Sequence, residues 1–261
     1  MANRILTAPR YIQSTDRMVG QSDPVYSDTL NLAAIDVLTG LQLVGAGAPL
    51  RFEYKSATTI TVKAGGIGIN TSGGKIYVID TDADLTFADL DTGAEAGNTL
   101  YYVWVGTASS VISLKISASA TTPTGLTYPV RFSGAFRNDG SSNIMPFIAT
   151  ADGMYWFDVD IAVAGADVTE VYDASLTTAF TDIPCSGFIP SGARLAYMTA
   201  NGGTYTLAVR DNSQLSTNGI VIAEAAARHI FPVVVNASGI FEAKRGTAET
   251  TRISVVGYQM F

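Results

Sequence analysis

Few side chains in this sequence could do chemistry, because the chain holds one cysteine and one histidine. A Ser-His-Asp triad would have to use His229, and no Gly-x-Ser-x-Gly elbow supplies a nucleophile for it. Cys185 alone can form neither an intrachain disulfide nor a cysteine-based zinc site, and we interpret it as a small buried apolar residue. We therefore expect no metal, no cofactor and no enzymatic activity.

One pair of carboxylates is a candidate for glycan contact. Asp158 and Asp160 follow Tyr155-Trp156-Phe157, and in a strand both would share a face with Trp156. Two acids across a groove can hydrolyse a glycosidic bond, and an aromatic ring beside acids can bind a sugar. The same residues also suit an ordinary sheet face at the rim of a sandwich, which is the interpretation we favour. A polysaccharide-binding or depolymerising protein is the alternative function.

An acidic run begins at residue 80 and opens like a calcium-binding loop. Asp80, Asp82 and Asp84 place carboxylates at alternate positions. Such a loop needs a glycine at its sixth position and a glutamate at its twelfth, where this chain has Leu85 and Asp91. We interpret the run as the solvent face of a strand end with the turns after it, and leave open whether it binds an ion.

Residues 1–48 differ from the rest and predict an N-terminal attachment arm. Residues 1–27 combine arginines and prolines with little periodicity, which is typical of a disordered arm or of one laid along a partner. Residues 28–38 predict a short helix or an extended segment. The candidate residues for attachment to a larger particle are Arg4, Arg10, Tyr11 and Arg17.

From residue 49 onward the sequence is typical of short strands. Apolar residues alternate with polar ones, and strand candidates recur about every 8–12 residues with turn residues between them. The turn at 138–142 predicts a hairpin of 130–137 with 143–149. We expect an all-β fold with two β-sandwich or barrel-like domains in tandem, at 49–118 and 129–261, joined by a linker at 119–128.

Composition and charge exclude several classes of partner. The net charge is −7 and the pI is about 4.6, which argues against binding to nucleic acid or to anionic membranes. No apolar run is long enough to span a membrane, and no signal peptide is visible, so we expect synthesis in a cytoplasm. Only 15% of the residues are charged, which is low for an isolated monomer and typical of a protein held in an assembly.

The segment from Gly125 to Phe147, followed by Tyr155-Trp156, resembles a segment of many fibre and virion proteins of tailed bacteriophages. It combines an arginine, a glycine, an Asn-Asp turn and the run Asn143-Ile144-Met145-Pro146-Phe147. The segments 38–41, 98–105 and 189–194 are similar to strands and strand entries of the same proteins. The resemblance departs at Thr124, where a proline is usual, and in having Arg131 alone where two basic residues are paired.

The resemblance implies a non-enzymatic structural protein, such as a head fibre, tail fibre, spike or capsid decoration protein. Such proteins are commonly homotrimers whose N-terminal region is fixed to the capsid, the portal-neck or the tail. Their β domains face the host surface and its glycans. The implied location is the virion, after synthesis in the host cytoplasm, and head and tail positions both fit.

Overall fold

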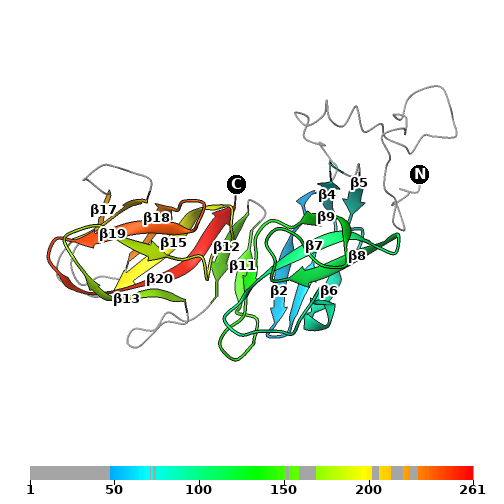
Figure 1. The fold of residues 1–261 in the computed structure, drawn as a ribbon, viewed down its shortest axis with the longest axis horizontal. Helices are drawn as coiled ribbons and strands as arrows, with labels where there is room; N and C mark the ends of the chain where they lie inside the picture. Colours follow the sequence, from blue (N-terminus) through cyan, green and yellow to red (C-terminus); the bar gives the residue numbers. More distant parts are fainter. Residues whose placement is uncertain are drawn as a thin grey trace, which may run out of the picture. The chain divides into compact units, whose positions relative to one another are not determined.

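The computed structural model describes residues 48–70, 72, 75–150, 153–158, 169–201, 206–212, 220–223 and 229–260. These residues form strands joined by turns, with one 3-10 helix at Phe87–Asp89, which confirms the expected all-β fold (Figure 1). The expected arm lies outside the described residues except for Ala48, and so does its expected helix. Among the described residues, no helix is long and apolar enough to cross a membrane.

The chain divides into two compact units. Of the described residues, unit 1 contains 48–55, 59–94 and 102–133, and unit 2 contains 56–58, 95–101 and those from 134 onward. The chain therefore passes between the units several times before residue 134. The expected linker at 119–128 and the expected boundary at 129 differ from this division, since unit 1 runs to Ser133.

Unit 1 is built from three small sheets. The first has the order β2-β3-β6 and the second β1-β4-β5, with β1 and β4 parallel. In the third, β7 pairs with β8 and β9, while the first two residues of β7, which belong to unit 2, pair with β10 of unit 2. The strands are β1 (Ala48–Pro49), β2 (Phe52–Ser56), β3 (Thr59–Val62), β4 (Gly66–Asn70), β5 (Lys75–Val78), β6 (Ala83–Thr86), β7 (Leu100–Ala108), β8 (Val111–Ser117), β9 (Thr127–Arg131) and β10 (Phe136–Arg137).

The period-two pattern of the sequence supplies the core of unit 1. In β3, Ile60 and Val62 are fully buried while the threonines between and beside them are not. Phe52 and Phe132 are both buried, with ring centroids 6.4 Å apart. Alternation of this kind is the signature of a sheet that buries one face.

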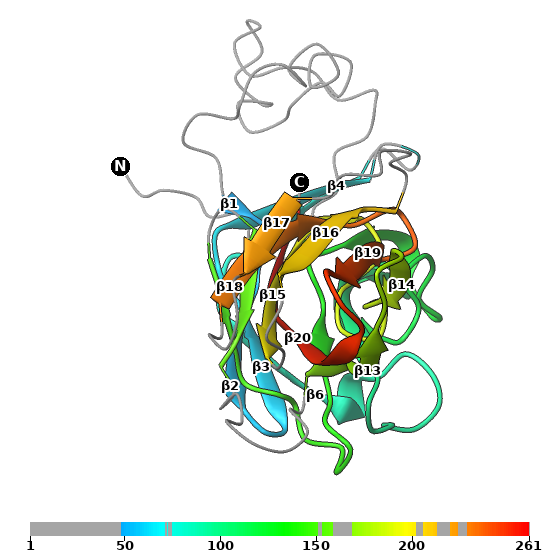
Figure 2. The same ribbon diagram turned by 90° about the vertical axis from the view of Figure 1, so that its left-hand side faces the viewer.

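Unit 2 is built from two larger antiparallel sheets. One has the order β11-β12-β20-β15-β18, with β13 also paired to β20, and the other has the order β14-β19-β16-β17. Figure 2 shows the second sheet running from β17 through β16 and β19 to β14. The strands are β11 (Phe147–Ala149), β12 (Met154–Phe157), β13 (Glu170–Leu176), β14 (Thr181–Pro184), β15 (Ala193–Asn201), β16 (Leu207–Asp211), β17 (Ile220–Ala223), β18 (His229–Val234), β19 (Ile240–Arg245) and β20 (Glu249–Met260).

Stacked aromatic rings anchor the inner face of the larger sheet. Tyr155 of β12 stacks on Tyr258 of β20, with ring centroids 5.0 Å apart and ring planes 10° apart. The Tyr258 hydroxyl donates to the carbonyl of Ala135 at 2.6 Å and accepts from its N–H at 2.8 Å. These bonds satisfy the polar end of a buried tyrosine, as burial requires.

Two local expectations were met only in part. The run at 83–86 is a strand, β6, paired antiparallel with β3 and not only a strand end with turns. The expected hairpin of 130–137 with 143–149 is reduced to one bridge, Asn138 to Ile144, because β9 and β10 both pair with β7 instead.

Candidate functional site

The predicted glycan residues lie in β12 and just beyond it. Trp156 is half-buried, and its ring centroid is 4.5 Å from that of Tyr197 on β15. Asp158 follows the last residue of β12 with an exposed side chain, and its N–H donates to the carbonyl of Pro146 at 2.8 Å. Asp160 lies outside the described residues. The structure therefore gives Trp156 an aromatic neighbour but does not describe the pair of acids.

Strand register places Trp156 in a row of side chains that crosses the larger sheet. Ile148 of β11 lies opposite Trp156, which lies opposite Gly257 of β20. Gly257 in turn lies opposite Tyr197, which lies opposite Pro232 of β18. Directly opposite residues of antiparallel strands project to the same face. The row therefore runs across the outer face of the sheet, opposite to the face that carries Tyr155 and Tyr258.

The two adjacent rows on this outer face combine apolar side chains with polar ones. Val234 lies opposite Leu195, which lies opposite Gln259. Ile230 lies opposite Thr199, which lies opposite Ser254. Ile148, Ile230 and Val234 are 55%, 62% and 50% exposed, so the described fold leaves them largely in contact with water. We call the apolar side chains of these rows the outer patch, which consists of Ile148, Met154, Trp156, Leu195, Tyr197, Ile230, Pro232 and Val234.

A glycine lets the two aromatic rings of the outer patch meet. Gly257 separates Trp156 from Tyr197 in the row, and a Cβ at Gly257 would lie 3.0 Å from Cε3 of Trp156. The same Cβ would lie 2.5 Å from the carbonyl oxygen of Tyr155. With no side chain there, the indole can lean over β20 toward the tyrosine ring. The Tyr197 hydroxyl reaches Oε1 of Gln259 at 3.5 Å, and this amide lies in the next row.

The smaller sheet of unit 2 has a different, charged outer face. Arg210 of β16 forms an ion pair with Glu242 of β19, directly opposite it. The Phe180 ring is covered by the Arg210 guanidinium at 4.0 Å and by the Lys244 ammonium at 4.4 Å. Asn212 donates to the Asp182 carboxylate. Apart from Val221, which is 64% exposed, the described outer face of this sheet is therefore mostly charged, as usual for a sandwich, whereas the larger sheet carries the outer patch.

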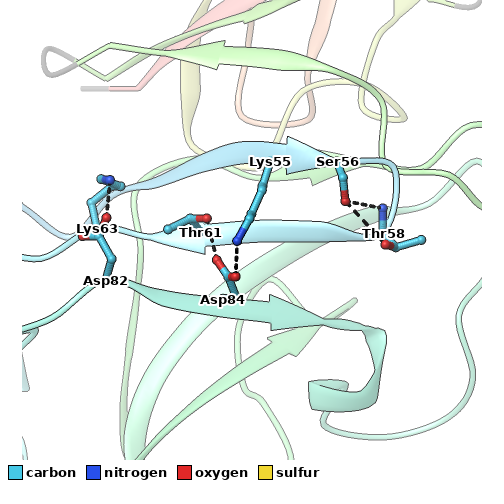
Figure 3. A network of polar contacts seen from close by, with 7 residues as sticks. All are labelled: Lys55, Ser56, Thr58, Thr61, Lys63, Asp82 and Asp84. Atoms are coloured by element: carbon cyan, nitrogen blue, oxygen red, sulfur yellow. Dashed lines mark hydrogen bonds and ion pairs between the residues drawn. The ribbon is translucent and has the colours of Figure 1, made fainter.

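The acidic run of unit 1 is occupied by contacts within the protein (Figure 3). Asp84 forms an ion pair with Lys55 and accepts from the Thr61 hydroxyl at 2.7 Å. Asp82 forms an ion pair with Lys63 and accepts from the Ala64 N–H at 2.8 Å. Asp84 thereby joins β6 to β2 and β3, and Asp82, just before β6, is joined to the two residues that follow β3.

These contacts favour the ionised form of both carboxyls. The Ala64 N–H, followed by the Lys63 ammonium, lowers the pKa of Asp82 below its usual range. The Lys55 ammonium, followed by the Thr61 hydroxyl, lowers the pKa of Asp84. Among the described residues, no group of three or more His, Cys, Asp or Glu side chains could hold a metal ion.

The remaining acids of the run also have structural contacts. Asp89 accepts from the Thr86 N–H at 3.0 Å and completes a capping box on the 3-10 helix. Asp91 accepts from the Thr124 N–H at 2.6 Å. The carboxylates thus fix strand β6 and the turns around it, in agreement with a structural interpretation of the run.

The segment that resembles phage fibre proteins is centred on a buried arginine. Arg137 donates from Nε to the Gly187 carbonyl at 2.8 Å and from a terminal nitrogen to the Asn138 carbonyl at 3.0 Å and to Oδ1 of Asn98 at 3.3 Å. Its guanidinium lies 4.0 Å from the centroid of the Phe188 ring. One side chain thereby connects three separate stretches of unit 2.

The turn after this arginine is held by an aspartate. Oδ1 of Asp139 accepts from the N–H groups of Ser141 and Asn143 at 2.8 and 2.9 Å. These bonds, more than the more distant Arg137, lower the pKa of Asp139. Asn138 donates from its side chain to Glu95 at 2.8 Å. The side chains of the motif therefore organise the fold around it.

Of the other predicted residues, the structure describes the side chain of Cys185 but not those of His229 or of the attachment residues. Cys185 is buried, as predicted, and burial raises the pKa of its thiol to about 12. His229 begins β18, and its side chain lies outside the description. The proposed attachment residues Arg4, Arg10, Tyr11 and Arg17 lie outside the described residues.

Sequence reasoning missed the aliphatic part of the outer patch. The available signal was the absence of alternation in two strands, at Leu195-Ala196-Tyr197-Met198 and at Ile230-Phe231-Pro232-Val233-Val234. A strand with one solvated face should alternate, whereas an uninterrupted apolar run is typical of a strand covered on both faces. That contrast could have identified the patch before the structure.

Residues 50–137 match the family model described as "Mtd second domain". This match covers about a third of the chain: most of the described part of unit 1 and the first residues of unit 2. It ends at Arg137 and does not include the outer patch. No curated protein and no solved structure matched the chain.

Proposed function

We propose that this chain is a non-enzymatic structural protein of a phage virion, serving as a fibre, spike or decoration protein. Its N-terminal arm, with Arg4, Arg10, Tyr11 and Arg17, anchors it to the capsid or the tail. Its β units are exposed for contact with the host surface. Identical copies associate, with a homotrimer as the expected form.

The observation that carries this proposal is the role of the segment from Gly125 to Phe147. The residues in which this segment resembles phage fibre proteins are residues that hold the fold together. Arg137 ties Gly187, Asn98 and Phe188 to one another, and Asp139 closes the turn. Because Arg137 and Asp139 hold the fold together and do no chemistry, the resemblance supports a shared scaffold and a structural role.

The direct test is to look for the chain in particles. Virions from a culture that carries the gene are purified by density gradient, and the chain is sought by peptide mass spectrometry and by antibody labelling in the electron microscope. The proposal expects several copies per particle and loss of host adsorption when Fab fragments against the chain are added. Absence of the chain from purified particles would overturn the proposal.

A polysaccharide-binding or depolymerising protein is the second candidate. The Trp156–Tyr197 pair, with centroids 4.5 Å apart and the exposed Asp158 nearby in sequence, favours it because sugars stack on aromatic rings. Purified protein is incubated with bacterial O-antigen and capsular polysaccharides, and new reducing ends are measured. Cleavage that is lost in Asp158→Asn and kept in the exposed control Asp80→Asn would establish this function instead.

A further inference from the structure

We propose that the outer patch of unit 2 is the interface for a second copy of this chain. The inference deepens the proposed function by naming the surface through which copies associate. It rests on that function only for its biological setting. Its test uses purified protein, so it can fail while the virion role stands.

The pattern of the strands argues that something covers the patch. In β18, Phe231 and Val233 are buried on the inner face, while Ile230 and Val234 are 62% and 50% exposed on the outer face. Water on the outer face would not require aliphatic residues at those positions, and the smaller sheet carries charges there. A strand that is apolar on both faces is typical of one that is buried on both.

The size of the patch suits the centre of a protein interface. Strands about 4.8 Å apart put β11 and β18 about 19 Å from each other, and three rows two residues apart span about 14 Å. The footprint is then about 300 Å², against about 800 Å² per partner in a stable complex. The patch would thus be the apolar core of an interface whose rim is more polar.

The geometry of the edge favours face-on contact. Strand β18 is at the edge of the sheet and contains Pro232, which has no N–H for pairing with another strand. Addition of a strand at this edge is therefore disfavoured. Ile230 and Val234, the exposed aliphatic side chains of β18, can instead lie against the half-buried Trp156 and Tyr197 of another copy.

The chemistry of the patch favours a copy of the chain over a glycan. The polar groups on its rows are the Tyr197 hydroxyl and the Gln259 amide, which are 3.5 Å apart, and the hydroxyls of Thr199 and Ser254. Thr199 and Ser254 are only 2% and 1% exposed, so a bound sugar could not reach them, and the exposed Asp158 lies just beyond the end of β12. Recognition of a sugar requires several hydrogen-bond donors and acceptors, whereas aliphatic side chains recognise a partner only by its shape. Only 15% of the residues of this chain are charged. The outer patch of one copy can therefore pack against the equally uncharged outer patch of another copy.

The test measures the mass of the full chain by sedimentation velocity, from about 1 µM to about 100 µM. Wild-type protein is expected to form dimers or trimers. Ile230→Lys and Val234→Lys should each raise the dissociation constant about 100-fold, because a lysine in the apolar centre is buried without a partner. The matched control is Val221→Lys on β17 of the other sheet, where the wild-type valine is 64% exposed, and it should leave the mass unchanged.

A second readout follows the patch itself. In the Trp104→Phe variant, Trp156 is the remaining tryptophan, and dilution below the dissociation constant should shift its emission to longer wavelength as its ring meets water. A monomeric wild type overturns the inference. Oligomers that persist in both lysine variants also overturn it, because the copies would then associate through another surface. Monomers that bind an O-antigen polysaccharide through Trp156 would assign the patch to a glycan instead.

Discussion

An alanine at Gly134 tests how tightly the inner face of unit 2 is packed. Gly134 has φ +83°, and a Cβ there would lie 2.2 Å from Cζ and 2.4 Å from Cε2 of Tyr155. The ring cannot easily retreat, because Tyr155 is buried and stacked on Tyr258 with a centroid separation of 5.0 Å. Gly134→Ala therefore forces the backbone, the ring or both to move.

The expected cost has two parts. A left-handed backbone costs a residue with a Cβ about 1–2 kcal/mol relative to glycine. Overpacking a filled core costs about 1–3 kcal/mol more. We expect Gly134→Ala to lower the free energy of unfolding of unit 2 by about 2–5 kcal/mol. Gly125 provides the control, because its φ is +75° but an added Cβ would meet nothing within 4 Å. Gly125→Ala should therefore cost unit 1 only about 1–2 kcal/mol, the backbone part.

The two tryptophans allow each unit to be followed separately in urea. Trp104 belongs to unit 1 and Trp156 to unit 2. Gly134→Ala is measured by Trp156 fluorescence in a Trp104→Phe background, and Gly125→Ala by Trp104 fluorescence in a Trp156→Phe background. Equal losses of unfolding free energy for the two alanine variants would refute the reasoning, since the Tyr155 ring would then have moved aside at no cost in free energy.

Three further predictions concern charged and buried groups. The lowered pKa values of Asp82 and Asp84 mean that their ionised forms stabilise unit 1 above the unfolded-state value of about 3.9, and that this contribution is lost as the pH falls below about 4. The double variant Asp82→Asn/Asp84→Asn should flatten the acid side of the unfolding curve, whereas Asp80→Asn should not. Arg137→Lys should lower the free energy of unfolding of unit 2, measured in urea, by about 2–4 kcal/mol. A lysine lacks the planar guanidinium that donates to the carbonyls of Gly187 and Asn138 at the same time. The Cys185 thiol, buried and with its pKa raised to about 12, should react with Ellman's reagent at pH 8 at least about 100-fold slower in the native chain than in urea, and rapid native labelling would contradict its placement.

Much of the fold could be predicted from local pattern. The all-β class follows from alternation and turn residues. The strand-like runs at 58–63, 111–116 and 239–244 nearly coincide with β3, β8 and β19 of the structure. Such strands form wherever β-branched and aromatic residues recur at period two between turn residues. The burial of Cys185 could be predicted for a similar reason, since a lone cysteine among apolar residues behaves as one of them.

Pairing could not be predicted in the same way. The expected hairpin around 138–142 was reduced to one bridge because β7 is long enough to accept β8, β9 and β10 as partners. The acidic run gave no sign that Asp82 and Asp84 would be held by lysines 19 and 29 residues away. Partners so distant in sequence are brought together only when the sheet forms.

The sequence by itself therefore determined the class of fold, the scarcity of reactive side chains and the strands that are apolar on both sides. Only the tertiary structure decided that Ile148, Trp156, Tyr197 and Pro232 form one row, because that row depends on the register of five strands drawn from distant parts of the chain. A strand's pattern fixes which residues share a face. The sheet alone decides which faces become neighbours, since pairing is set by the total burial of all strands together.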